Sequence, residues 1–356
     1  MNNNEKSKGL QVLHTGNIEL VRPPSGSIKE RMAVGALTIA RQKLLAESFQ
    51  LYTVGTYELH ETDYRQLQVW GNMLGSDVED LLDGLSQLFY TLGDEDYVEL
   101  KIEKGHIQSL VLDFDLFTLE QFDFLEGLQI KTLCFLGACP TGRLRVHLSS
   151  LGSLYCDENQ ITELDLSAIP QLKVLSCWGN QLTDLDLSEV PQITELACWN
   201  NQLTNLNLSV VPQLIRIYCG ENQLTELDLS AVPQLKHFFC EENQIRELDL
   251  SAVPQLKVLS CRNNQLTELD LSAVPQLIRI HCGENQLTEL DLSAVPQLIW
   301  IDCRENQLTE LDLSVVPQLT NLECDENQLT ELDIRSLKQL KTLNVDKAVH
   351  VIGNRP

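Results

Sequence analysis

The sequence predicts a solenoid of the α/β class, in which short parallel strands stack into one sheet on a concave face behind an α-helical N-terminal cap. Two observations lead to this prediction. Cysteines recur every 21 residues from Cys156 to Cys324, and an asparagine follows each of them by three positions. Prolines keep the same interval from Pro170 to Pro317. A fixed period of this length is typical of stacked supersecondary units rather than of a globular core.

One unit of the repeat reads LKVLSCWGNQLTDLDLSEVPQ and runs from Leu172 to Gln192. This frame resembles that of the leucine-rich-repeat family, L-x-x-L-x-[LC]-x-x-N-x-L. Its second half is similar to the bacterial 21-residue subtype called IRREKO. Nine consecutive units keep the frame, and degenerate units extend the resemblance over residues 107–346. The resemblance implies a horseshoe whose parallel sheet lines the concave face.

The spacing within a unit assigns a place to each residue type. Leu172, Leu175 and Cys177 fall where a short strand and its exit turn inward, and a stack of such coils buries what one coil cannot. Asn180 is expected to bond backbone groups that would otherwise be buried without partners. Ser188 is a good cap for a helical turn, and a proline is tolerated in the first turn that follows.

The regularly spaced cysteines could form disulfides or bind a metal ion. Neighbouring Cα atoms would lie about 4.8 Å apart, which does not exclude a disulfide. The column nevertheless holds an odd number of cysteines, at a position where the family has leucine, and Phe135 and Val345 take this position at the ends. We therefore expect small core hydrophobes. We expect no metal, because a metal site would require accessible ligands and usually histidine.

Two acidic columns account for much of the negative charge. One contains Glu163 and Asp184, the other Asp165 and Asp186, and Asn205 and Asn207 interrupt both columns in the same coil. We expect the second column to accept local backbone N–H groups in Asx turns, and the first to form a solvated face. Calcium binding is an alternative, but the glycine-rich repeat of known calcium-binding solenoids is missing.

The domain boundaries follow from where the repeat begins and ends. We expect a mobile segment over 1–26, a mostly helical cap or docking domain over 27–105, the solenoid over 106–346 and a C-terminal tail over 347–356. Helices are predicted for 27–49, 62–74 and 76–92, because these segments have an amphipathic pattern. Alternating polarity on both sides of Lys104-Gly105 predicts a hairpin.

Charge and composition exclude several classes of partner. The formal net charge is −25, with 26 Lys and Arg against 51 Asp and Glu, which disfavours nucleic acid and anionic membranes. No signal peptide is visible and no apolar run approaches the ~20 residues of a membrane helix. Many neighbouring thiols are safest in a reducing compartment, so we expect a cytoplasmic protein, with delivery into a host cytosol as a possible route.

A short motif, Cys139-Pro-Thr-Gly142-Arg-Leu-Arg145, fits the phosphate loop of cysteine phosphatases. Such a loop holds phosphate beside a thiolate through backbone N–H groups and an arginine. Ala138 stands where that family has histidine, and no helix is predicted to follow. We therefore expect an irregular loop in a degenerate coil, and no enzyme, cofactor or small-molecule substrate.

The solvent-facing columns of the strands vary while the rest of the repeat is nearly copied. They contain aromatic residues, histidine and arginine, which are common in interface hot spots. The alternative is neutral drift on a solvated surface. The residues predicted to contact a partner are Tyr155, Trp178, Trp199, Arg216, Tyr218, His237, Phe239, Arg279, His281, Trp300, Asp302 and Arg304.

The expected function is therefore a scaffold that binds an unidentified protein through its concave face. Three alternatives remain open. The protein could be a secreted bacterial effector that binds a host cytosolic protein, or a structural or surface adhesion protein. It could also resemble the effector ubiquitin ligases with leucine-rich repeats, which carry a large catalytic C-terminal domain. The chain ends about eleven residues after its last predicted strand, so we do not expect that activity.

Overall fold

The computed structural model describes residues 51–74, 76–91, 97–113, 128–139 and 142–356. The chain divides into two compact units, the first formed by 1–111 with 124–130 and the second by 112–123 with 131–356. The segment expected to be mobile, 1–26, and the helix predicted for 27–49 lie outside the described residues.

The described part of the N-terminal unit alternates short strands with two helices. A fully buried cluster around Leu59, Leu67, Trp70 and Leu82 forms its core. Strands β1 and β2 pair in an antiparallel hairpin, β3 pairs with β4, and β5 pairs with β6, all antiparallel. The elements are β1 (Leu51–Val54), β2 (Tyr57–His60), α2 (Glu61–Leu74), α3 (Val78–Ser86), β3 (Phe89–Thr91), β4 (Tyr97–Glu99), β5 (Lys101–Glu103) and β6 (His106–Asp113).

The sequence predicted part of this unit correctly. Helix α2 matches the helix predicted for 62–74, and the hairpin predicted at Lys104-Gly105 is the β5–β6 turn. The helix predicted for 76–92 begins later, after the N-cap Asp77, and ends at Ser86. The prediction was wrong for its last residues, because the aromatic and β-branched side chains of β3 favour a strand. This strand pairs with β4.

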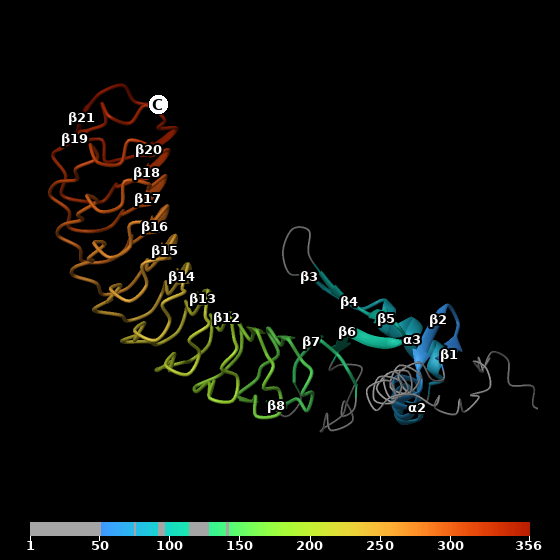
Figure 1. Cartoon of the computed structure of the whole chain (residues 1–356). Coiled ribbons are helices and arrows are strands. Elements are labelled where there is room, and N and C mark those ends of the chain that lie inside the picture. The colour runs from blue at the N-terminus through green and yellow to red at the C-terminus, as the bar shows by residue number, and fades with distance from the viewer. Residues whose placement is uncertain (1–50, 75, 92–96, 114–127, 140–141) are drawn as a thin grey trace, which may run out of the picture. The chain divides into compact units, whose positions relative to one another are not determined.

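The repeats form one continuous parallel sheet, which Figure 1 shows along the inner side of a curved stack. Each strand from β9 to β18 pairs with the strand one repeat further on, so that Val174 faces Glu195 and Glu195 faces Arg216. The sheet order follows the chain order, as in a horseshoe. Its strands are β7 (Thr132–Leu136), β9 (Ser153–Tyr155), β11 (Val174–Ser176), β12 (Glu195–Ala197), β13 (Arg216–Tyr218), β14 (His237–Phe239), β15 (Val258–Ser260), β16 (Arg279–His281), β17 (Trp300–Asp302), β18 (Asn321–Glu323) and β20 (Thr342–Asn344).

Each coil contributes the same apolar side chains to the core. Leu175, Cys177, Leu182 and Val190 are fully buried, and their counterparts in the other coils are also buried. Burying one such side chain stabilises the fold by about 1.5–3 kcal/mol relative to leaving it exposed. The prediction that the cysteine column belongs to the core is confirmed, since all eleven cysteines are buried thiols.

The asparagines form a ladder along the core, as the sequence predicted. The side-chain amide of Asn201 donates to the carbonyl oxygens of Cys177 in the preceding coil and Cys198 in its own coil, at 3.0 and 3.1 Å. Its Oδ1 accepts the backbone N–H of Leu182 at 3.0 Å. One side chain therefore satisfies buried backbone groups of two successive coils, and the same pattern recurs in the next coils.

The convex connections are turns, which corrects the expectation that Ser188 caps a helical turn. The N–H of Ser188 instead donates to Oδ1 of Asp186 at 2.9 Å, and the N–H of Val190 bonds the Leu187 carbonyl oxygen. Pro191 has no N–H, so a helix cannot continue through it. The Asx turns predicted for the aspartate column are confirmed by equivalent bonds in the other coils.

Both ends of the stack carry a second short parallel sheet. At one end β8 (Arg143–Arg145) pairs with β10 (Glu163–Asp165). At the other end β19 (Glu331–Asp333) pairs with β21 (His350–Ile352). Residues 347–356, expected to be a simple tail, therefore include a strand that pairs with the preceding coil.

Candidate binding surface

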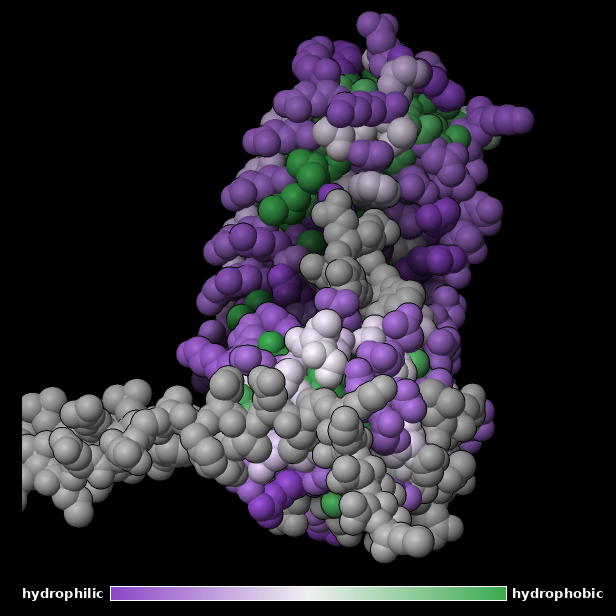
Figure 2. All heavy atoms as spheres, turned by 90° about the vertical axis from the view of Figure 1, so that its right-hand side faces the viewer, coloured by the Kyte–Doolittle hydropathy of each residue, from purple (hydrophilic) through white to green (hydrophobic). Residues whose placement is uncertain are grey.

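The candidate site is the outward side of the strands from β9 to β18 with the residues just after each strand, which we call the concave face. The middle residue of each strand is buried and its two neighbours point outward, because side chains alternate along a strand. Where Figure 2 leaves this region in view, apolar and intermediate side chains lie between hydrophilic rims. The alternation therefore places variable side chains on the outward side of an otherwise repeated framework, where most of them are half-buried.

Aromatic side chains of successive coils stack on one another across the face. The rings of Trp178 and Trp199 have centroids 4.7 Å apart and planes 10° apart. Tyr218 and Phe239 stack in the same way, with centroids 4.8 Å apart. The ring separation matches the spacing of neighbouring strands, so residues in one column lie in van der Waals contact. The result is two rigid, half-buried aromatic pairs.

A third aromatic group lies near the C-terminal end of the face. The ring of His281 stacks on Trp300 with centroids 5.6 Å apart, and the guanidinium of Arg279 lies 5.7 Å from the centre of the same indole. Burial is the main cause that lowers the pKa of His281, although Asp302 and Glu323 oppose it. This favours the neutral imidazole, which can donate and accept a hydrogen bond.

Ion pairs hold most of the arginines of the face in place. Arg216 bonds Glu195 of the preceding coil at 2.9 Å, and Arg262 pairs with Glu284 of the next coil. Among the described residues Arg279 takes part in no ion pair, and its guanidinium contacts Trp300 instead. Arg279 is therefore the arginine of this face that remains available to an acidic group.

The residues predicted to contact a partner lie on the concave face, but Asp302 is not available to a partner. Asp302 is only 2% exposed, and its carboxylate receives the Nε and Nη2 of Arg304 at 3.0 and 2.8 Å. It therefore orients Arg304, which also reaches Glu323 at 3.0 Å, rather than presenting itself to a partner. Tyr155 and His237 lie half-buried on the face, and burial raises the pKa of Tyr155 and lowers that of His237.

Sequence reasoning missed the charge polarity of the face. Lysines stand immediately before several strands, at Lys131, Lys173, Lys236, Lys257 and Lys341. Carboxylates follow the strands, at Glu158, Glu221, Glu242, Glu284, Glu305 and Glu326. Since all strands run in one direction, the two columns form a basic edge and an acidic edge along the sheet. This charge polarity was already visible in the repeat frame, where lysines recur at the position before the strand and glutamates recur after it.

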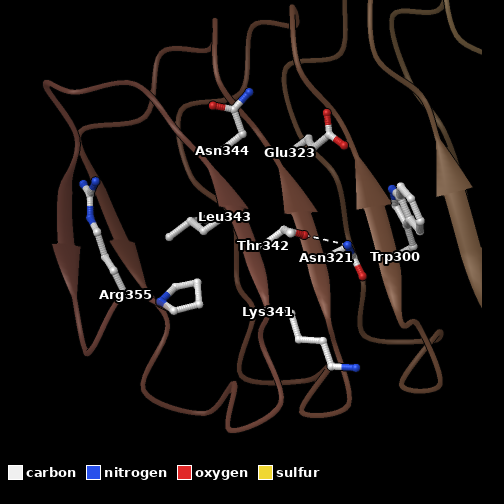
Figure 3. Close-up of a pocket in the computed structure, with 9 residues that line it drawn as sticks. Trp300, Asn321, Glu323, Lys341, Thr342, Leu343, Asn344 and Arg355 are labelled. Carbon is white, nitrogen blue, oxygen red and sulfur yellow. Dashed lines mark hydrogen bonds between the residues drawn. The ribbon is translucent and has the colours of Figure 1, made fainter.

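A cavity of about 590 Å³ lies at the C-terminal end of the face, where Trp300 meets the chain terminus. Figure 3 shows Lys341 at the start of its strand, Glu323 and Asn344 at the strand ends, and Arg355 on the C-terminal segment. Asn321 donates to the hydroxyl of Thr342 at 2.6 Å across its floor. The lining mixes polar side chains with the apolar surfaces of Trp300, Leu343 and Pro356, and the cavity is open to solvent, which suits a side chain of a partner better than an enclosed ligand.

The cysteines offer no reactive group in the repeat. Burial raises the pKa of Cys198 and of Cys261 to about 12 each, so the thiolate that a nucleophile or metal ligand requires is not formed at neutral pH. The loop with the phosphatase-like pattern is no phosphate cradle in its described part. Arg145 lies in strand β8 and pairs with Asp165 at 3.0 Å, and Cys139 is buried.

The N-terminal unit contains a separate polar cluster. Within the described ranges, His60, Asp63 and His106 are the histidine, cysteine and acidic side chains that could hold a metal ion together. Burial is the main cause that lowers the pKa of His60, followed by the neighbouring His106. The sequence did not indicate this cluster, because its members lie far apart in a segment without a recognisable motif.

The comparisons with known proteins agree with the geometry. No protein-family model matches the chain, and no curated protein matches it. The functional domain of InlJ from Listeria monocytogenes, which includes a cysteine ladder, is 29% identical over 69% of this chain and 67% of its own, with a TM-score of 0.49. Internalin InlF of the same species is 20% identical over 65% and 72%, with a TM-score of 0.58. The leucine-rich-repeat domain of APL1 is 17% identical over 72% and 71%, with a TM-score of 0.53.

The likenesses to InlF and to the APL1 domain, both with a TM-score above 0.5, show the fold. The repeat region is a leucine-rich-repeat solenoid, as the repeat frame predicted, with about 11 turns. In the part of the chain that the structure describes, no helix has the length and apolar character to cross a lipid bilayer.

Proposed function

We propose that the protein is an interaction scaffold that binds a protein partner through the concave face. The observation that carries this proposal is the contrast between a nearly copied core and a variable outer surface. The buried frame repeats from coil to coil, whereas the outward positions hold stacked aromatics, histidines and arginines. Stacked, half-buried aromatic rings lose little side-chain entropy when a partner covers them, which is the property of an interface hot spot.

The charge polarity supports a protein partner rather than a nucleic acid. The basic and acidic edges on opposite sides of the aromatic column match a surface with charges of both signs, and complementary charges fix the orientation of a partner. A phosphate backbone carries a single sign of charge, and this chain has a net charge of −25. Arg279, whose guanidinium is stacked on Trp300, provides an anchor for a carboxylate of the partner.

We further propose that the protein acts in a reducing compartment and has no enzymatic activity of its own. Eleven buried thiols, with no disulfide among them, suit a cytosol. An effector delivered into a host cytosol would use the same face and the same thiols. A surface adhesion protein would work in an oxidising medium, which the thiol column disfavours.

A quantitative affinity capture tests the proposal. The full chain is immobilised beside a Trp178→Ala/Trp199→Ala variant and a Gln192→Ala control on an exposed convex turn, and the retained proteins are compared. We expect a partner that the wild type and the control retain and the double variant loses by about 30-fold or more in affinity. Circular dichroism verifies that the variants fold. Equal retention of every protein by all three would refute binding through this face.

A further inference from the structure

Three side chains of the N-terminal unit meet although they are separated in sequence. His60 ends strand β2, Asp63 lies in the first turn of α2, and His106 begins strand β6. A nitrogen of each imidazole and an oxygen of the carboxylate lie within 4.8 Å of one another. The two imidazole rings have centroids 4.3 Å apart.

The backbone is built to bring these elements together. The N–H of His60 donates to the carbonyl oxygen of Gly105, the residue before His106, at 2.6 Å. Gly105 has a φ of +82°, and a Cβ there would lie 2.5 Å from Leu51 Cδ2 and 3.0 Å from the His60 nitrogen. Only glycine permits this approach, because any side chain would collide with β1 and β2. The contact between the two histidine-bearing segments is therefore close and specific.

Backbone and side-chain bonds also fix the orientation of the carboxylate. Oδ1 of Asp63 accepts the N–H of Ile107 at 2.8 Å, and Oδ2 lies 2.9 Å from Nδ1 of His106. The Asp63 side chain is 1% exposed, whereas that of His106 is 21% exposed. Nδ1 of His60 accepts the N–H of Thr62 at 3.3 Å, which leaves its Nε2 free to ligate. A buried carboxylate thus faces two partly accessible imidazoles.

We propose that His60, Asp63 and His106 form a binding site for a divalent transition-metal ion of the Zn²⁺ type. Two imidazoles and one carboxylate are a ligand set that Zn²⁺ accepts, with water in the remaining position. The ion would balance the buried negative charge of Asp63, which costs free energy without a countercharge. The site goes beyond the concave face and lies in a unit to which the proposed function assigns no role.

Cobalt substitution tests this site on the full chain. Metal-free protein is titrated with Co²⁺, whose visible absorption reports the coordination geometry, and Zn²⁺ is then added in competition. We expect one saturable site with the intense visible bands of tetrahedral or five-coordinate Co²⁺, which Zn²⁺ abolishes. His60→Ala and His106→Ala should each weaken the affinity by about 100-fold, and Asp63→Asn, which keeps the bond from Ile107, by about 10-fold or more.

His350→Ala, an exposed histidine in β21, is the matched control and should leave the titration unchanged. His60→Gln replaces His60→Ala if circular dichroism shows that the alanine variant is unfolded. Unchanged Co²⁺ affinity in a folded His60 variant would overturn the proposal. A thiolate-to-cobalt charge-transfer band would also overturn it, because the ligands would then be cysteines.

Discussion

The side chain of Asn264 donates to the carbonyl oxygen of Cys240, in the preceding coil, at 3.0 Å. It also donates to Cys261 of its own coil at 3.1 Å and accepts the N–H of Ile245 at 3.0 Å. Asn264 is 8% exposed, so water cannot take over these bonds. The asparagine ladder therefore joins neighbouring coils through buried polar groups, in addition to the apolar core.

Replacing Asn264 with alanine should lower the free energy of unfolding by about 2–4 kcal/mol, because several buried backbone groups lose their partners at once. Urea denaturation followed by circular dichroism measures this loss. Asn327→Ala in the last complete coil is the control, since this asparagine makes similar bonds but is less buried. A loss at Asn327 as large as at Asn264 would contradict the argument from burial.

The aspartate column makes stability sensitive to acid. The N–H groups and hydroxyls of the following serines lower the pKa of Asp249 and Asp291 below the value of 3.8 for an unperturbed group, and Arg335 lowers the pKa of Asp333 to about 2. Because these pKa values are lower in the folded state, their stabilisation is complete above pH 3.8. It is lost as the pH falls from about 4 towards 2.

Thermal unfolding measured between pH 5 and pH 2 should therefore show a decrease concentrated below pH 4. Asp249→Asn/Asp270→Asn/Asp291→Asn should flatten this decrease, because asparagine keeps the turn without titrating. Asn207 demonstrates the geometry, since its Oδ1 accepts the N–H of Ser209 at 3.0 Å. If the triple variant kept the full acid sensitivity, the Asx turns would not be its source.

The residue before each ladder asparagine adopts a left-handed conformation, although it is glycine only at Gly179. Glu305 has a φ of 50°, and among the described residues its side chain makes no hydrogen bond or ion pair. Glu305→Gly should stabilise the protein by about 0.5–1 kcal/mol, because glycine adopts positive φ without the Cβ penalty. Glu305→Gln removes the same charge without relieving the backbone. Equal stabilisation by both variants would attribute the gain to charge instead.

The thiols should be inert in the folded protein and all present after unfolding. Burial raises the pKa of the column, so a thiol reagent at pH 8 should react negligibly with native protein and with eleven groups in denaturant. The thiols should be counted in protein purified without reductant, so that any disulfides formed are preserved. A count well below eleven would reveal disulfides and would contradict the proposed reducing compartment.

The solenoid could be predicted because the same pattern of apolar residues recurs in each repeat of the sequence. The spacing of Leu172, Leu175 and Cys177 defines which side chains turn inward, and nine copies of the frame leave one register for the sheet. The convex turn was less predictable, since Ser188 has a helix-capping propensity that Asp186 overrides by accepting its N–H. The burial of Asp302 was also hidden, because it depends on the side chain of Arg304 in the same coil.

The N-terminal unit lacks this redundancy. The polarity pattern predicted α2 and the β5–β6 hairpin, but β3 depends on its pairing with β4. His60 and His106 approach each other through a tertiary contact at Gly105, which no local pattern encodes. The candidate metal site therefore depends on tertiary contacts that the sequence does not reveal, whereas the columns of the concave face follow directly from the repeat spacing.

The strict register of the parallel sheet also makes whole coils interchangeable. Each coil offers the next one the same carbonyl oxygens, N–H groups and apolar surface, as the equivalent bonds around Asn222 and Asn285 show. Excising or duplicating one 21-residue unit would rejoin two surfaces that already fit. Recombination between copies could thus lengthen, shorten or reorder the aromatic and charged columns without remaking the core. A gene of this kind can change what its product recognises faster than it changes how the product folds.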